Sequence, residues 1–158
     1  MLDACRLSKT PVIASHTALR TARGGTDDKF APRGITEECA VAVAATGGVL
    51  GPVLCPEFLS TKPGQMPGAS LAAGARHIAA WIALVNRECS AKLGPNCGEG
   101  AIALGTDFDG WIPSIPQEKE DISYMPLLTY FLLEAGVSEE AVKGMYGENF
   151  LRVWSQAA

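Results

Sequence analysis

Long apolar runs and clusters of positive charge are both missing from the sequence. No stretch reaches the ~18 uninterrupted apolar residues of a membrane-spanning helix, and no group of Lys and Arg is longer than a dipeptide. The formal net charge is −4 and the pI is near 5.2. Together these features argue against a nucleic-acid partner and against a membrane-binding patch. We therefore expect the partner to be a small molecule.

Targeting signals are missing as well. Residues 1–30 lack the basic and then apolar order of a signal peptide. The C-terminal sequence "LRVWSQAA" lacks the hydrophobic tail of a lipid-anchor signal. We therefore expect a soluble, cytoplasmic chain.

Cysteine is present, but without a CxxC pair. The odd number of five cysteines leaves at least one thiol free, and we expect reduced, mostly buried thiols. In an oxidising compartment, the loop "CSAKLGPNC" offers the alternative of a local disulfide between Cys89 and Cys97.

What is present is the composition of an ordinary globular protein, 158 residues long and 47% hydrophobic, which is enough for one domain. Apolar segments that predict buried strands alternate with segments that predict helices. The expected strands lie near 11–16, 49–54 and 101–106, and the expected C-terminal helices near 122–135 and 138–155. This alternation predicts an α/β fold with a parallel sheet, whose functional residues gather at the C-terminal ends of the strands.

Two chemically useful side chains stand at such strand ends, His16 in "IASHT" and Asp107 in "GTDFDG". A neutral imidazole at a strand end can bind a metal. A carboxylate at the same edge of the sheet can bind the metal as well, or can move a proton from the water that the metal binds. Two structural alternatives stay open: His16 caps the following loop, or Asp107 forms an Asx turn, a role that Asp109 before Gly110 suits better.

Two further candidates are less distinctive. His77 lies in the apolar helical segment "ARHIAAWIALV", where a packed or half-exposed position is more usual than metal binding. Arg33 in "APRGITEE" precedes an expected helix. It is either an ordinary surface residue or a residue whose guanidinium binds a substrate carboxylate through two parallel hydrogen bonds.

The order and spacing of four motifs indicate a relationship to a known family: "KTPVIASHT", "RGITEECAVAVAATGGVLG", "ALGTDFDG" and "EAGVSEEAVKGMYGENFLRVW". With these motifs the chain resembles the C-terminal part of the membrane (renal) dipeptidase family. The resemblance covers nearly the whole chain and is lowest in residues 56–68 and 88–100.

The resemblance implies a fold, a reaction and residue roles. Residues 1–158 would form a single partial domain, the last three strands and helices of a TIM-type (β/α)8 barrel that hydrolyses dipeptides at a two-zinc centre. His16 would be a zinc ligand, and Asp107 would shuttle the proton of the attacking water. Arg33 would grip the substrate carboxylate, with Arg20 or Arg23 as substitutes because the spacing to Arg33 is longer than in many relatives.

Compared with a complete barrel of about eight strands, this chain lacks most strands and most of the family's metal ligands. One histidine does not hold a two-metal site, because zinc takes at least three protein ligands. We therefore expect the chain to be inactive alone and to associate with copies of itself or with a complementing N-terminal half. The alternatives are another metal-dependent amidohydrolase-type barrel enzyme, such as a deaminase or phosphotriesterase, and a non-catalytic assembly piece.

Overall fold

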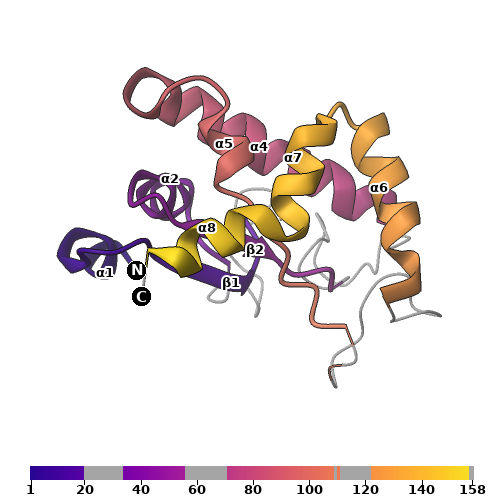
Figure 1. The fold of residues 1–158 in the computed structure, drawn as a ribbon, viewed down its shortest axis with the longest axis horizontal. Helices are drawn as coiled ribbons and strands as arrows, with labels where there is room; N and C mark the ends of the chain where they lie inside the picture. The colour runs from indigo at the N-terminus through magenta and orange to yellow at the C-terminus, as the bar shows by residue number, and fades with distance from the viewer. Residues whose placement is uncertain (20–33, 56–70, 109, 111–121, 157–158) are drawn as a thin grey trace.

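The computed structural model describes residues 1–19, 34–55, 71–108, 110 and 122–156. Helices dominate and a small sheet lies among them (Figure 1). In chain order the elements are α1 (Leu2–Leu7), β1 (Ile13–Thr17), α2 (Glu37–Ala45), β2 (Val49–Pro52), α4 (Leu71–Leu93), α5 (Cys97–Gly100), the 3-10 turn η3 (Ile122–Tyr124), α6 (Met125–Glu134), α7 (Glu139–Lys143), the π turn η4 (Gly144–Glu148) and α8 (Asn149–Ser155).

Helix α2 begins and ends at residues suited to those positions. The Thr36 hydroxyl accepts a hydrogen bond from the Cys39 N–H at 3.2 Å, and acidic residues follow in the first turn, where the helix dipole favours them. After the helix, Gly47 takes a φ of +76°, a left-handed conformation that glycine adopts without strain. This turn directs the chain into β2.

The sheet consists of β1 and β2, which run parallel, with Ile13 opposite Val49 and Ala14 opposite Leu50. Because neighbouring residues of a strand point to opposite faces, the sheet contributes to two groups of buried side chains. Leu50 joins the main core with residues of α2 and α4, whereas Val49 packs with Ala103 and with Val153 of α8. Strand β2 is therefore covered on both faces, as its uninterrupted apolar run predicts, whereas β1 has exposed residues at Ile13, Ser15 and His16.

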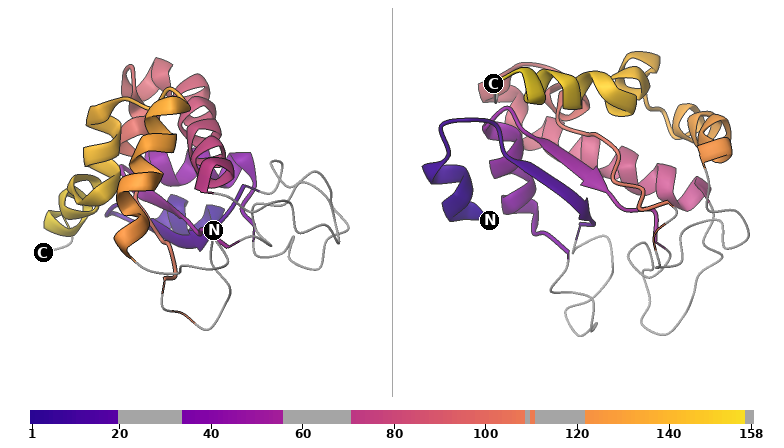
Figure 2. Two further views of the ribbon diagram at one scale, coloured as in Figure 1. Left: turned by 90° about the vertical axis from the view of Figure 1, so that its right-hand side faces the viewer. Right: turned by 60° about the horizontal axis from the view of Figure 1, so that its bottom comes forward.

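The expected third strand near 101–106 is not a regular strand. The segment runs beside β2 (Figure 2) but forms a single isolated parallel bridge, between Leu50 and Ile102. The Leu50 N–H donates to the Ala101 carbonyl and the Ala103 N–H to the Leu50 carbonyl, both at 2.8 Å. Further along, the Gly105 N–H donates to the Pro52 carbonyl at 3.2 Å, but Pro52 has no N–H to donate in return, so the ladder is incomplete there.

The main core lies between the sheet, α4 and the neighbouring helices. Helix α4 packs against α2, α5 and α6, and its Trp81 and Ile78 side chains are completely buried. Leu128 and Leu132 of α6 are buried in the same core. No helix in the described part of the chain is both long and apolar enough to cross a membrane.

The single helix expected near 138–155 is interrupted. Ser138 caps α7 by accepting the Ala141 N–H at 3.1 Å, but the chain then passes through η4, where Gly147 departs from helical geometry, before α8 begins. Glycine weakens a helix by about 1 kcal/mol, and the side chain of Asn149, discussed below, bonds outside the helix. The two C-terminal helical segments therefore meet at a kink.

Candidate functional site

The candidate site begins at a local irregularity of β1. The strand register runs from Ala14 opposite Leu50 to Thr17 opposite Pro52, with an irregularity between. Within it, His16 has a φ of +54°, which is unusual for any residue other than glycine. Irregular strand positions of this kind redirect a side chain.

Asp107 follows the bridged segment and has a similar backbone conformation, with a φ of +60°. Its carbonyl accepts a hydrogen bond from the Gly110 N–H at 3.1 Å, which closes a turn. Before it, the Thr106 hydroxyl accepts from the Phe108 N–H at 3.3 Å. Asp107 is therefore a turn residue as well as a candidate functional residue.

Two glycines allow the three chain segments to approach at this end. A Cβ at Gly105 would lie 2.9 Å from the backbone nitrogen of His16 and 2.9 Å from the Gly51 carbonyl oxygen. A Cβ at Gly51 would lie 3.2 Å from the Ser15 Cα. Larger residues would push the segment that carries Asp107 away from β1.

The structure brings His16 and Asp107 together. The His16 Nε2 lies 4.0 Å from the Asp107 Oδ1, and the two side chains are 51% and 33% exposed. This distance is longer than a hydrogen bond, and both groups remain accessible. An imidazole and a carboxylate arranged in this way can take part in metal binding or in proton transfer.

The structure does not describe the other expected site residues. Arg33 falls outside the described residues, as do Arg20, Arg23 and Asp109. Within the described ranges, no group of three or more His, Cys, Asp or Glu side chains is arranged to hold a metal ion.

His77 belongs to the packed interior, as the sequence analysis favoured. The residue is buried in α4, and its Nε2 accepts hydrogen bonds from the Trp81 Nε1–H at 2.9 Å and from the Leu19 N–H at 3.4 Å. A ring nitrogen occupied in this way is not available to a metal. His77 therefore ties α4 to the segment after β1.

The sequence analysis missed two residues of the "GENFLRVW" motif that connect α8 to the rest of the fold. The Asn149 Nδ2 donates to the Glu99 and Ile102 carbonyls, both at 2.8 Å. The Arg152 guanidinium donates to the Gly47 carbonyl at 2.7 Å and to the Gly100 carbonyl at 2.8 Å. These acceptors lie at the starts of β2 and of the bridged segment, so this motif supports the strands at the end opposite to His16 and Asp107.

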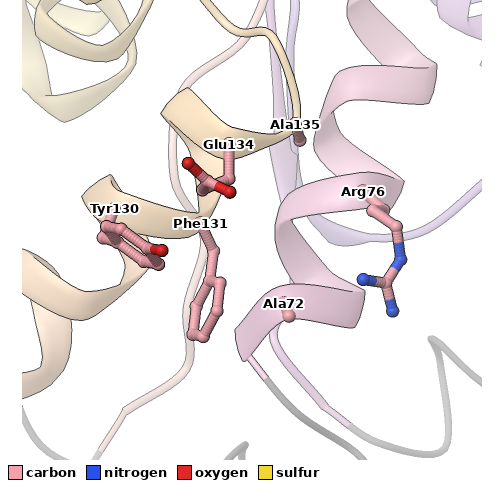
Figure 3. Close-up of a pocket in the computed structure, with 6 residues that line it drawn as sticks. All are labelled: Ala72, Arg76, Tyr130, Phe131, Glu134 and Ala135. Carbon is pink, nitrogen blue, oxygen red and sulfur yellow. The ribbon is translucent and has the colours of Figure 1, made fainter.

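A separate hollow of about 350 Å³ lies between α4 and α6. Figure 3 shows its lining, in which the Arg76 side chain extends away from Glu134. The remaining lining residues are Ala72, Tyr130, Phe131 and Ala135. Neither His16 nor Asp107 reaches this hollow, which therefore lies outside the candidate site.

Comparison with known sequences identifies the family. The profile of the membrane dipeptidase family, peptidase family M19, matches residues 1–158. The chain belongs to this family. The sequence is 31% identical over 157 residues to an uncharacterized dipeptidase of Schizosaccharomyces pombe, covering 99% of this chain and 33% of that protein. It is 29% identical over 154 residues to dipeptidase ataJ of Aspergillus terreus, covering 98% of this chain and 32% of that protein.

Solved structures agree on the fold of this family member. A metallo peptidase from Rhodobacter sphaeroides, solved with a phosphinate mimic of the dipeptide L-Ala-D-Ala, matches with a TM-score of 0.71 at 22% identity, over 99% of this chain and 39% of that chain. Dipeptidase AC, also of family M19, matches with a TM-score of 0.70 at 22% identity, over 98% of this chain and 40% of that chain. The chain has an α/β fold similar to M19 metallopeptidases and spans about a third of the length of the curated relatives it matches.

Proposed function

We propose that the chain is the C-terminal part of a zinc-dependent dipeptidase with a TIM-type barrel. Residues 1–158 would supply three neighbouring strand positions and the helices that cover them. Family membership supports the reaction class, and the approach of His16 to Asp107 supports the location of the site. That approach, between residues from separate segments of the sheet, is the observation on which the proposal depends.

The metal requirement fits this chain only in part. When bound, zinc lowers the pKa of a coordinated water and polarises the substrate carbonyl. His16 offers an exposed imidazole to one metal, and Asp107 offers a carboxylate beside it. Because zinc needs at least three protein ligands and the described residues contain no such group, the remaining ligands would come from residues outside the described part of the chain.

Each candidate residue has a separate task in this proposal. His16 binds metal through a neutral ring nitrogen, and its position in the strand irregularity aims the ring toward Asp107. Asp107 accepts the proton of the attacking water and passes it to the amine that leaves when the peptide bond breaks. Arg33 selects substrates with a free carboxylate through two parallel hydrogen bonds.

A chimera tests the function directly. The segment of the Aspergillus terreus dipeptidase that aligns with this chain is replaced by residues 1–158, and zinc content, folding and hydrolysis are measured. We expect the chimera to hydrolyse dipeptides, whereas the isolated 158-residue chain with added zinc does not. A folded chimera that holds zinc but cleaves no dipeptide, or that cleaves only phosphotriesters or deaminates a base, would contradict the proposal.

The same chimera tests the role of Arg33. Arg33→Ala should raise KM for free dipeptides much more than for dipeptides with an amidated C-terminus, because only the free carboxylate bonds to the guanidinium. Arg20→Ala and Arg23→Ala are measured in the same assay, and a selective effect in one of these variants would assign the role to that arginine instead. Equal effects on both substrates would remove Arg33 from the site.

A further inference from the structure

Helices α4 and α5 pack so closely that their backbones are in contact. A Cβ at Gly98 would lie 2.3 Å from the Ile82 carbonyl oxygen, so glycine is required at this crossing. The Gly98 N–H also donates to the Asn86 side-chain oxygen at 2.7 Å. This close packing fixes the position of α5 on α4.

Two cysteines lie near this contact, one on each helix. Cys89 of α4 is buried and Cys97 of α5 is partly buried, and both are free thiols. The Cys97 Sγ donates to the Val85 carbonyl at 3.5 Å and thus lies against the preceding turn of α4. The Cys89 Sγ donates to the Val41 carbonyl of α2 at 4.0 Å, and burial, followed by the proximity of Cys97, raises the pKa of the Cys89 thiol.

The turn between the two cysteines supports this arrangement. Gly94 and Asn96 have φ values of +91° and +62°, so the chain reverses tightly there and returns α5 to the surface of α4. Glycine and asparagine are the residues that adopt this conformation most readily. This turn therefore returns Cys97 to the stretch of α4 between Val85 and Cys89.

We propose that Cys89 and Cys97 form a reversible disulfide that crosslinks α4 and α5. A low-molecular-weight disulfide, such as oxidised glutathione, is the oxidant. The more exposed Cys97 thiolate attacks one of its sulfurs, which forms a mixed disulfide and releases one glutathione thiolate. The Cys89 thiolate then attacks the Cys97 sulfur and displaces the second glutathione. Two electrons pass from the protein to the oxidant, and the two thiol protons go to solvent or to the released thiolates.

The second step should depend on pH. Because the pKa of the Cys89 thiol is raised, little of its thiolate exists at neutral pH. The fraction of thiolate, and with it the rate of ring closure, should increase as the pH rises toward that pKa.

The crosslink would act on the segment that leads to Asp107. Helix α5 continues directly into the residues bridged to β2. The Glu99 and Gly100 carbonyls of α5 also accept the hydrogen bonds from α8. A disulfide would therefore hold the start of this segment and slow its local opening.

Peptide mapping of the purified full-length chain tests the proposal. The chain is incubated with oxidised glutathione, unreacted thiols are blocked with iodoacetamide, and a digest without reductant is analysed by mass spectrometry. We expect a crosslinked peptide that contains Cys89 and Cys97 and that dithiothreitol removes. Amide hydrogen exchange of residues 97–103 should slow several-fold in the oxidised chain.

Cysteine variants provide the controls. Cys97→Ser should eliminate the crosslink, whereas Cys39→Ser should leave it unchanged. Separate glutathione adducts on Cys89 and Cys97, or pairing of either with another cysteine, would overturn the proposal.

Discussion

At the residue scale, His16 and Asp107 share a backbone conformation that costs stability. Both have φ values in the left-handed region, which is unfavourable by roughly 1–2 kcal/mol for residues other than glycine. His16 lies in the irregular part of β1 and Asp107 follows the bridged segment, and their side chains approach each other. Strain of this kind is concentrated at functional sites, which is consistent with the proposed roles.

Substitution of these two residues in the catalytically complete chimera separates those roles. His16→Ala should abolish dipeptide hydrolysis and reduce the bound zinc, because the imidazole binds the metal. Asp107→Asn should lower kcat by about 10²–10⁴-fold while zinc content stays the same, since it removes a proton-transfer group. Steady-state kinetics and metal analysis measure both effects. Loss of zinc from Asp107→Asn would instead make Asp107 a ligand.

At the element scale, α8 is held by its polar side chains as much as by its apolar ones. Asn149 is buried and reaches two carbonyls, and Gly144 leaves room for that side chain, because a Cβ there would lie 2.9 Å from the Asn149 Nδ2. The kink between α7 and α8 therefore places Asn149 where the bridged segment begins.

Asn149→Ala should lower the free energy of unfolding of the chain by about 2 kcal/mol, because two carbonyls lose their donor inside the protein. Urea denaturation followed by circular dichroism measures the change. Ser155→Ala is the matched control in the same helix, since its exposed hydroxyl bonds only to the Arg152 carbonyl, and its effect should stay within about 0.5 kcal/mol. Equal effects of the two substitutions would contradict the structural role given to Asn149.

At the scale of the whole molecule, the chain leaves apolar side chains exposed on several elements. Leu151 and Trp154 of α8 are 64% and 65% exposed, and Ile13 of β1 is 44% exposed. In a complete barrel of the proposed kind, additional strands and helices would cover such surfaces. The exposed side chains therefore support the interpretation that more of the enzyme packs here.

We accordingly expect the isolated chain to self-associate. Sedimentation velocity should show oligomers that grow with concentration, because burial of apolar surface drives association. The double variant Leu151→Lys, Trp154→Lys should shift the chain toward monomer, whereas Glu139→Lys, at an exposed position of α7, should not. A wild-type chain that stays monomeric over the same concentrations would contradict this expectation.

Features set by neighbouring residues could be predicted from the sequence. Thr36 caps α2 and glycine ends it, as the local pattern indicates, and the apolar surroundings of His77 favoured a packed position. The break before α8 was missed, because it depends on where Asn149 finds its acceptors. The irregular third segment was missed too, because the proline that interrupts its ladder belongs to a different strand, β2.

The sequence by itself therefore determined the family, the order of helices and apolar strands, and the two side chains worth examining. Local propensities and motifs depend on residues close together in the chain, and sequence patterns record them directly. Only the tertiary structure decided that His16 and Asp107 approach to 4.0 Å and that the Cys97 Sγ lies 3.5 Å from the Val85 carbonyl oxygen of α4. These contacts join distant or folded-back segments, so they depend on strand register, on close approach at glycines and on the packing of whole elements.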